Sequence, residues 1–436
     1  MNRAATSAVT DAERPAGMPW PVIGLLTVCF TLSFVDRNLL AILVTPVKAS
    51  LQLSDTELGI LQGVSFSVFY VAVSLPLAWL ADRYNRAHLM SVCIATWSLM
   101  TMLCGLSNSF GQLLAARIGV ASGEAGLSPA ALTMMADRLA PKQLARATAI
   151  FMLAPVLGSF VALAGGGTLY AATLGWTLPV IPGIGVLERW QLVFLMIGAP
   201  GLLGALAVLA IRDPRSRPAA RADGTAFAEL FDFVRRDWRI AGLYMLIIAM
   251  MGIMLAAYGA WAPAALMRSH GVDERIVGLY WGPIYLIAGA AGTLLGGVLA
   301  GNDDQVAVRT VRVMRATAWA LLPVALAAPL LSSLAASLIL MGAAIFLISI
   351  VNGLSSLPMQ FMAPRGVRAQ AIALQGLLAA LLGLGLGPLL VGSLSDLLPF
   401  ANRSLGAALA LLGAVIVPIK IALLHRVVRN QRRAAA

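Results

Sequence analysis

Charged residues and histidines are scarce in this chain of 436 residues. Only 11% of the residues are charged and three are histidine, whereas 60% are hydrophobic and the mean hydropathy is +0.87. A soluble domain has about 25% charged and about 45 to 50% apolar residues. The composition therefore excludes a soluble globular protein and predicts an integral membrane protein. Its apolar runs exceed the length of barrel strands, which excludes a transmembrane β-barrel.

The motifs of metal, redox and hydrolytic sites are also missing from the sequence. Cys29, Cys93 and Cys104 fall within apolar runs, without a Cys-x-x-Cys pair or a Cys/His cluster, and are expected to be packing residues. The sequence has no Gly-x-Ser-x-Gly elbow and no P-loop. We therefore expect no metal, no cofactor and no catalytic residues. A membrane-embedded lipid enzyme and an ATP-driven pump are both disfavoured.

Long apolar runs bounded by charge clusters predict an all-α integral membrane protein with twelve transmembrane helices in two pseudo-symmetric six-helix bundles. The expected domains are an N-terminal tail at 1–18, a first bundle at 19–211, a linker at 212–238, a second bundle at 239–428 and a tail at 429–436. The helices are expected at about 19–47, 56–81, 87–107, 110–137, 142–171, 190–211, 239–268, 274–300, 307–331, 333–363, 368–395 and 401–428. Within the linker, 227–234 is typical of a short amphipathic surface helix.

The distribution of Lys and Arg predicts how the chain lies in the membrane. Of the 31 such residues, 23 fall in segments on the same side as the N-terminus, five in the opposite loops and three within spans. Because cytoplasmic loops are enriched in Lys and Arg, this bias predicts a multi-pass membrane protein with both termini in the cytoplasm. The net charge of +12 thus reflects orientation rather than nucleic-acid binding. Lys420, within the last span, is expected to snorkel to the cytosol.

The two halves of the sequence resemble each other weakly. The end of the second helix, 79–83, matches the end of the eighth, 298–302. Similarly, the fifth helix has Pro155 followed by Gly158, and the eleventh has Pro388 followed by Gly392. Chance matches are possible in sequence rich in Gly and Ala, but the shared offset of six helices favours an internal repeat, as in a six-plus-six transporter.

Four ionisable residues lie deep in predicted spans: Asp36 and Arg37 in the first helix, Arg117 and Glu124 in the fourth. A charge at a helix centre costs about 2.5 to 3.5 kcal/mol on insertion scales, so such residues are functional candidates with nearby partners. Arg117 and Glu124 are about 10.5 Å apart along one helix, too far to pair directly. We therefore expect Asp36 to pair with Arg117, and Arg37 with Glu124. A purely structural salt-bridge cluster is the alternative.

Four stretches of the first half carry a family resemblance. They are VDR at 35–37, LSDTELG at 53–59, AWLADRYNR at 78–86 and RIGVASGEA at 117–125. The third resembles the loop signature of the major facilitator superfamily, from which it departs at Ala78 and Asn85, where the family pattern has Gly. Together the stretches resemble the bacterial Spinster-like branch, over roughly residues 30 to 170. Related symporters of organic anions share parts of the pattern.

This resemblance implies a secondary transporter of a bacterial inner membrane that works by alternating access between the two bundles. It implies Asp36 as the proton site, with Arg37, Arg117 and Glu124 as coupling partners. It also implies a cytosolic gate formed by Asp82, Arg83 and Arg86, in which Asp82 lies near 366–370 at the start of the eleventh helix, where a helix dipole favours an anion. The implied substrate is an amphipathic lipid, such as a lysophospholipid or a sphingoid phosphate.

The second half contributes no deep charge besides Lys420, so its share of a substrate cavity is expected to come from polar and aromatic residues. The candidates are Asn352, Tyr258, Trp261 and Gln375. The expected partners are a small-molecule or lipid substrate, protons and membrane lipids, with no nucleic acid, and we expect a monomer. A symporter of small organic anions is the main alternative, and a passive facilitator or a transport-derived sensor is also considered. The linker is too short for a signalling domain.

Overall fold

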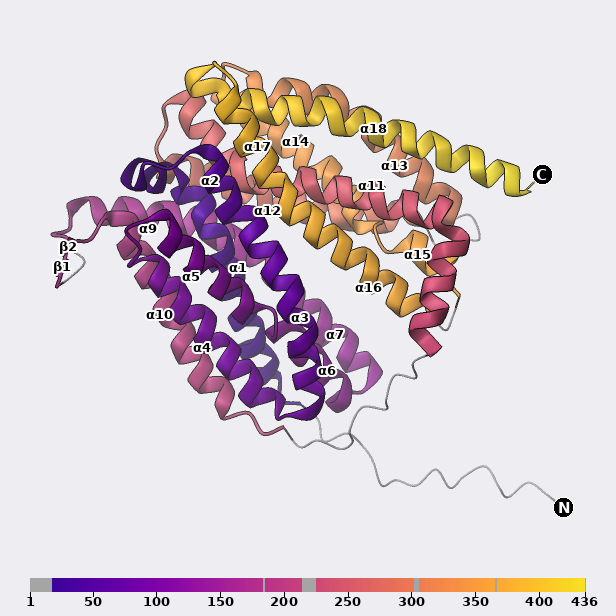
Figure 1. The fold of residues 1–436 in the computed structure, drawn as a ribbon, viewed down its shortest axis with the longest axis horizontal. Coiled ribbons are helices and arrows are strands. Elements are labelled where there is room, and N and C mark those ends of the chain that lie inside the picture. Colours follow the sequence, from indigo (N-terminus) through magenta and orange to yellow (C-terminus); the bar gives the residue numbers. More distant parts are fainter. Residues whose placement is uncertain (1–17, 183–184, 214–224, 302–305, 365–366, 436) are drawn as a thin grey trace.

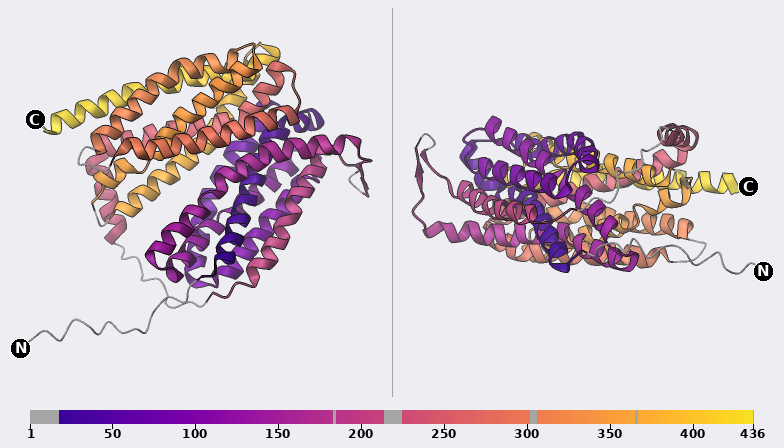
Figure 2. Two further views of the ribbon diagram at one scale, coloured as in Figure 1. Left: turned by 180° about the vertical axis from the view of Figure 1, so that it is seen from behind. Right: turned by 90° about the horizontal axis from the view of Figure 1, so that it is seen from below.

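The structure is a computed structural model that describes residues 18–182, 185–213, 225–301, 306–364 and 367–435. These residues form two helical bundles, one from each half of the chain, and a small hairpin (Figures 1 and 2). This agrees with the fold class predicted from the apolar runs. Because lipid offers no hydrogen bonds to an exposed main chain, helices are the expected solution for such a sequence.

The first bundle contains the six predicted helices, some of them interrupted. Its elements are α1 (Trp20–Leu51); α2 (Asp55–Gly59), η2 (Ile60–Val64) and α3 (Ser65–Arg83); α4 (Arg86–Cys104); α5 (Phe110–Glu124) and α6 (Leu127–Arg138); α7 (Pro141–Phe151), α8 (Ala154–Phe160), η3 (Val161–Gly165), α9 (Gly166–Ala172) and η4 (Thr173–Gly175); and α10 (Arg189–Leu209). The antiparallel strands β1 (Val180–Ile181) and β2 (Gly185–Val186) form the hairpin before α10.

The second bundle repeats this plan. Its elements are α11 (Thr225–His270); α12 (Glu274–Ala300); α13 (Val306–Ala327) and η5 (Ala328–Leu330); α14 (Leu334–Gly353) and α15 (Leu357–Met362); α16 (Arg368–Leu378), η6 (Ala379–Leu384) and α17 (Gly385–Leu397); η7 (Ala401–Arg403); and α18 (Ser404–Ala435). The amphipathic helix expected at 227–234 lies inside α11 rather than forming a separate element. Residues 214–224 of the expected linker lie outside the described residues.

Eleven helices of the described chain are long and apolar enough to cross a membrane. The fourth predicted span, which a turn at Ala125 and Gly126 divides into α5 and α6, is the exception. It also carries both Arg117 and Glu124, which lower its hydropathy. Contacts with α3 and α4 cover this charged span inside the bundle, so that it need not be apolar on every face.

The bundles meet at one end and diverge toward the other (Figures 1 and 2). They are joined where α2 and η2 pack on α17, and where α8, η3 and α9 pack on α12. These contacts lie toward the end whose loops are poor in arginine, here called the arginine-poor end. At the opposite, arginine-rich end, the two bundles stand apart (Figures 1 and 2). We call the two contact regions the α2/α17 seam and the α9/α12 seam.

Glycines bring the main chains close together at both seams. A Cβ on Gly63 of η2 would overlap the main-chain oxygen of Gly385 in α17. At the other seam, a Cβ on Gly278 of α12 would overlap the main-chain oxygen of Leu163 in η3. The α2/α17 seam joins spans two and eleven, and the α9/α12 seam joins spans five and eight. The two seams are therefore equivalent under exchange of the halves, as an internal repeat requires.

Lys420 does not snorkel as the sequence suggested. Its side chain is fully buried, and Nζ lies 2.7 Å from Sδ of Met251 in α11. The physical reason is that α18 turns this position toward α11 inside the bundle, which leaves the side chain no path to the polar interface. The described residues thus include a lysine held in an apolar environment without a paired carboxylate.

Candidate functional site

Arg37 of α1 and Glu124 of α5 form the predicted ion pair. Arg37 Nη2 lies 2.6 Å from Glu124 Oε2, and Nε of the same guanidinium donates to that oxygen at 3.2 Å. The Glu124 side chain is buried, whereas that of Arg37 is 17% exposed. A charge-assisted contact of this kind holds the guanidinium in one orientation. One side of the arginine therefore faces the carboxylate while another stays accessible.

Aromatic rings surround the guanidinium of Arg37. Its carbon Cζ lies 4.4 Å from the ring centroid of Phe34, 4.3 Å from that of Phe66 and 5.3 Å from that of Tyr70. Cation–π attraction is strongest where water is excluded, so these rings stabilise the positive charge as well as shaping its surroundings. None of these three residues was predicted from the sequence, although Phe34 lies only three residues before Arg37 on the same helix.

Arg117 approaches Asp36, but not in the way predicted. Its Nη1 donates to the main-chain oxygen of Asp36 at 3.2 Å, and its Nε donates to that of Leu61 at 3.4 Å. The Asp36 carboxylate instead accepts a hydrogen bond from Thr101 Oγ1 at 3.1 Å, and its Oδ1 is buried without a hydrogen-bond partner. The expectation of a side-chain ion pair between Asp36 and Arg117 is therefore wrong. Helical spacing predicts that Asp36 and Arg117 lie at one depth. It does not predict that the guanidinium binds main-chain oxygens rather than the carboxylate.

A cavity of about 380 Å³ lies between the bundles beside this cluster. Arg37 is the one charged side chain among its described lining residues. Polar groups are contributed by Asn38, Gln62, Ser159, Tyr285, Thr293, Ser349 and Asn352. Small and apolar residues of α11 form much of the opposite wall: Gly252, Leu255, Ala256, Gly259 and Ala260. The cavity thus combines a single cation with neutral polar groups and an apolar wall.

Of the four residues expected in the cavity, Asn352 lines it and the other three do not. Tyr258 is fully buried beside the lining residue Gly259, Trp261 Nε1 donates to the main-chain oxygen of Pro388 at 2.8 Å, and Gln375 donates to that of Ser355 at 2.7 Å. Composition identifies polar and aromatic residues in a span but not the face on which they lie. The same limit explains why Asn38 and Gln62 were missed.

Arg86, predicted in the cytosolic gate, holds together one end of the first bundle. Its guanidinium contacts the carboxylates of Asp137 and Asp213, the latter at 2.8 Å, and its main-chain N–H also donates to Asp213. Arg83 lies with its guanidinium 3.9 Å from the ring centroid of Trp79. The side chain of Asp82 and residues 365–366 lie outside the described residues. The gate role of Asp82, Arg83 and Arg86 stays a prediction.

A metal site is not apparent in the part of the chain that the structure describes. No group of three or more His, Cys, Asp or Glu residues that could hold a metal ion occurs among the described residues. The charged groups near the cavity instead hold one another, and Arg37, which pairs with Glu124, also lines the cavity. The arrangement suits recognition of a charged ligand rather than bond-breaking chemistry.

Three comparisons with known proteins agree with this architecture. The family model of the Major Facilitator Superfamily matches residues 26–388. An MFS-type efflux pump of Mycolicibacterium smegmatis is 32% identical over 411 residues, which is 91% of this chain and 90% of that protein. Protein spinster homolog 1 of Rattus norvegicus is 32% identical over 245 residues, 55% of this chain. That alignment covers 44% of the rat protein, less than half of its length.

A solved structure gives the same result for the fold. The crystal structure of a bacterial homologue of the human lysosomal transporter Spinster, in an inward-facing and unoccupied conformation, is 27% identical to this chain. The match covers 94% of each chain with a TM-score of 0.75. The arrangement of the two bundles is thus shared with a transporter over nearly the whole chain.

Proposed function

This chain belongs to the Major Facilitator Superfamily and is a Spinster-like transporter rather than an enzyme, and from that premise we propose that it is proton-coupled and carries an amphipathic anion by alternating access. The observation that carries this proposal is the position of Arg37. It is the one charged side chain among the described residues of the cavity wall, and its counter-charge, Glu124, is buried behind it.

Anion binding and the state of Glu124 are linked through Arg37. A phosphate or carboxylate that enters the cavity competes with Glu124 for the same guanidinium, since both offer anionic oxygens. A proton on Glu124 would weaken its hold on Arg37 and leave the guanidinium for the substrate. Such reciprocal effects are the basis of coupling between two ligands.

Asp36 is the proposed proton carrier. The residue is 2% exposed, one oxygen of its carboxylate accepts a hydrogen bond from Thr101, and the other oxygen has no hydrogen-bond partner. A permanently charged carboxylate in such a place would be costly. Asp36 and Arg37 are adjacent on α1, and Arg117 holds the main-chain oxygens of both. A local change at one residue is therefore transmitted to the other through the helix backbone.

The cavity supports a substrate with an anionic headgroup and an apolar part. The apolar wall on α11 faces the bundle that carries Arg37, so an amphipathic molecule can place its headgroup on the arginine and its chain along the wall. A lysophospholipid or a sphingoid phosphate has this form. Small organic anions are the second candidate, because the cavity is near the lower end of the range of about 300 to 1,000 Å³ for ligand pockets.

The charge distribution supports the orientation. We infer an inner membrane location with both termini in the cytoplasm, so that the diverging, arginine-rich end faces inward. In this orientation Asp82, Arg83 and Arg86 lie on the cytosolic side. We also infer the functional boundaries 19–211 and 239–428 for the two moving bundles, joined by the linker at 212–238, and a monomer as the transport unit.

The direct test is substrate-dependent proton flux in proteoliposomes. Purified protein is screened over lysophospholipids, sphingoid phosphates and small organic anions, with a pH-sensitive dye inside the vesicles. We expect flux with a single-chain lipid anion, and its loss in the variant Arg37→Met. Arg146→Met, which removes an exposed arginine of α7, serves as the matched control and should retain flux.

Three outcomes would contradict parts of the proposal. Uptake that is independent of any pH gradient would refute proton coupling. Flux with small organic anions alone would refute the lipid substrate. Full activity of Arg37→Met would refute the role of the arginine in binding the anion.

A further inference from the structure

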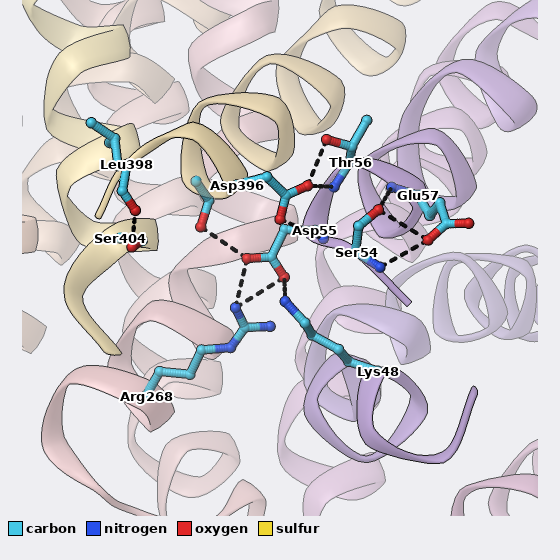
Figure 3. A network of polar contacts seen from close by, with 10 residues as sticks. Lys48, Ser54, Asp55, Thr56, Glu57, Arg268, Asp396, Leu398 and Ser404 are labelled. Atoms are coloured by element: carbon cyan, nitrogen blue, oxygen red, sulfur yellow. Dashed lines mark hydrogen bonds and ion pairs between the residues drawn. The ribbon is translucent and has the colours of Figure 1, made fainter. Parts of the chain in front are cut away.

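A network of polar contacts ties the two bundles together at the arginine-poor end (Figure 3). At its centre, Asp55 of α2 pairs with Arg268 of α11 at 2.8 Å and accepts a hydrogen bond from Ser395 of α17 at 2.8 Å. Asp55 belongs to the first bundle, whereas Arg268 and Ser395 belong to the second. Its carboxylate is therefore a link between halves that alternating access must separate.

A second carboxylate makes a link in the opposite direction. Asp396 of α17 accepts hydrogen bonds from the main-chain N–H groups of Asp55 and Thr56 at 3.0 and 2.7 Å, and from Thr56 Oγ1 at 2.6 Å. Each bundle thus supplies one aspartate that is held by donors of the other. The two links are adjacent, because both involve Asp55: its main chain binds Asp396 and its side chain binds Arg268.

The surroundings of Asp55 show that these links are partly removed from water. The Asp55 side chain is 4% exposed and that of Arg268 is 17% exposed. Lys48 of α1 also contacts Asp55, with Nζ 2.6 Å from Oδ1, but it comes from the same bundle and is 34% exposed. Hydrogen bonds to charged groups that are partly removed from water contribute more than an exposed ion pair does.

Close main-chain packing makes the network sensitive to separation. Gly392 of α17 lies against the main-chain oxygen of Asp55, where a Cβ would overlap it. Any opening of the α2/α17 seam therefore stretches every one of these contacts together. The α9/α12 seam is different: among the described residues, the ion pair that crosses between the bundles is Arg268–Asp55, at the α2/α17 seam.

We propose that Asp55, Arg268, Ser395 and Asp396 form a latch that holds the arginine-poor face shut and sets the fraction of molecules in the conformation closed on that side. Because a conformational equilibrium shifts by the difference in interactions between its two states, contacts made only in the closed state favour that state. At the α9/α12 seam, no ion pair between the bundles occurs among the described residues. The opening of the face is thus controlled at one seam, although the fold has two equivalent ones.

This inference rests on the proposed alternating access, but on neither the substrate nor proton coupling. The test is a distance measurement between spin labels on Ser50 and Asn402, two exposed residues on opposite bundles at this end. Protein without the two introduced cysteines is the control that shows how much spin label attaches to the native residues Cys29, Cys93 and Cys104. We expect one short-distance population in the parent protein.

Removing a cross-bundle contact should add a population at longer distance. In Asp55→Asn and in Arg268→Met, we expect the ratio of the long-distance to the short-distance population to rise at least about fivefold. This change corresponds to about 1 kcal/mol. The double variant should not exceed the larger single effect by much, since both changes break the same pair. Lys48→Met is the matched control: it removes a cation from the same carboxylate but no link between bundles, so its distribution should match the parent.

An unchanged distribution in both Asp55→Asn and Arg268→Met would overturn the latch. A shift as large in Lys48→Met would also overturn it, because it would show a general effect of charge near Asp55. If Asp55→Asn fails to fold, Asp396→Ala and Ser395→Ala test the same claim from the second bundle. If these variants shift the distance distribution of a protein that shows no measurable proton flux, the latch is supported. Only the proposed proton coupling is then contradicted.

Discussion

The ion pair between Arg37 and Glu124 can be tested by its energetic coupling. The perturbation is Arg37→Met, which keeps an apolar stem against Phe34 and Phe66 but removes the guanidinium. Glu124 then keeps a side chain that is 1% exposed, with Oε1 already lacking a hydrogen-bond partner and Oε2 losing both contacts from Arg37. A buried carboxylate would be left without a counter-charge.

The magnitudes differ between the two single variants. Removing one partner of a buried ion pair costs about 3 to 5 kcal/mol, which we expect for Arg37→Met. Glu124→Gln should cost less, about 1 to 2 kcal/mol, because Arg37 stays 17% exposed and can be solvated from the cavity. In the double variant neither charge is left, so its cost should be well below the sum. We expect a coupling energy of about 2 to 3 kcal/mol.

The assay is unfolding of the four proteins by SDS in mixed micelles, followed by tryptophan fluorescence. The coupling should be largest at neutral pH and should shrink as the pH falls, because protonated Glu124 needs no counter-charge. The reasoning is refuted if the costs of the single variants simply add in the double variant. It is also refuted if the coupling grows on acidification.

Three further expectations concern other buried groups. Asp36→Asn should abolish the response of uptake to a pH gradient but preserve substrate counterflow, since the amide resembles a protonated carboxyl; uptake by Asp36→Asn that is still driven by the gradient would contradict this. Lys420→Met should raise the free energy of unfolding by at least about 1 kcal/mol, because it replaces a buried cation with an apolar chain of similar size. The same SDS titration measures this free energy, and a loss of stability would show that Lys420 has a stabilising role. Gly392→Val should shift the Ser50–Asn402 distance distribution toward long distances, because its Cβ cannot fit against Asp55 when the seam is closed, whereas Gly297→Val, at a position with open space, should leave the distribution as it is.

The membrane fold could be predicted from the sequence because its cause is local. Each apolar run must satisfy its main-chain hydrogen bonds within itself, so run length alone predicts a helix. The charges at the ends of the runs divide the chain in the same way. The one span that composition alone does not identify as membrane-crossing is α5 with α6, where Arg117 and Glu124 lower the hydropathy and a turn follows Glu124. The length of this run between flanking charge clusters nevertheless predicts a span at about 110–137.

The pairing of Arg37 with Glu124 was also predictable. Helix direction placed the two residues at compatible depths, and a buried charge needs a partner. The same reasoning failed for Arg117, since an arginine has five donors and main-chain oxygens of α1 satisfy it as well as a carboxylate does. Depth along a helix can be read from spacing, but the choice among nearby acceptors cannot.

The sequence by itself determined the helices, their number and the cluster of deep charges, because these follow from the transfer of side chains and main chain into lipid. Only the tertiary structure decided which faces of the helices line the cavity, which is why Asn352 was found and Asn38 and Gln62 were not. It alone also decided the contacts of Asp55, whose partners Arg268 and Asp396 lie more than 200 and 300 residues away along the chain. Contacts between bundles depend on how two rigid bodies pack, and no local pattern of residues carries that information.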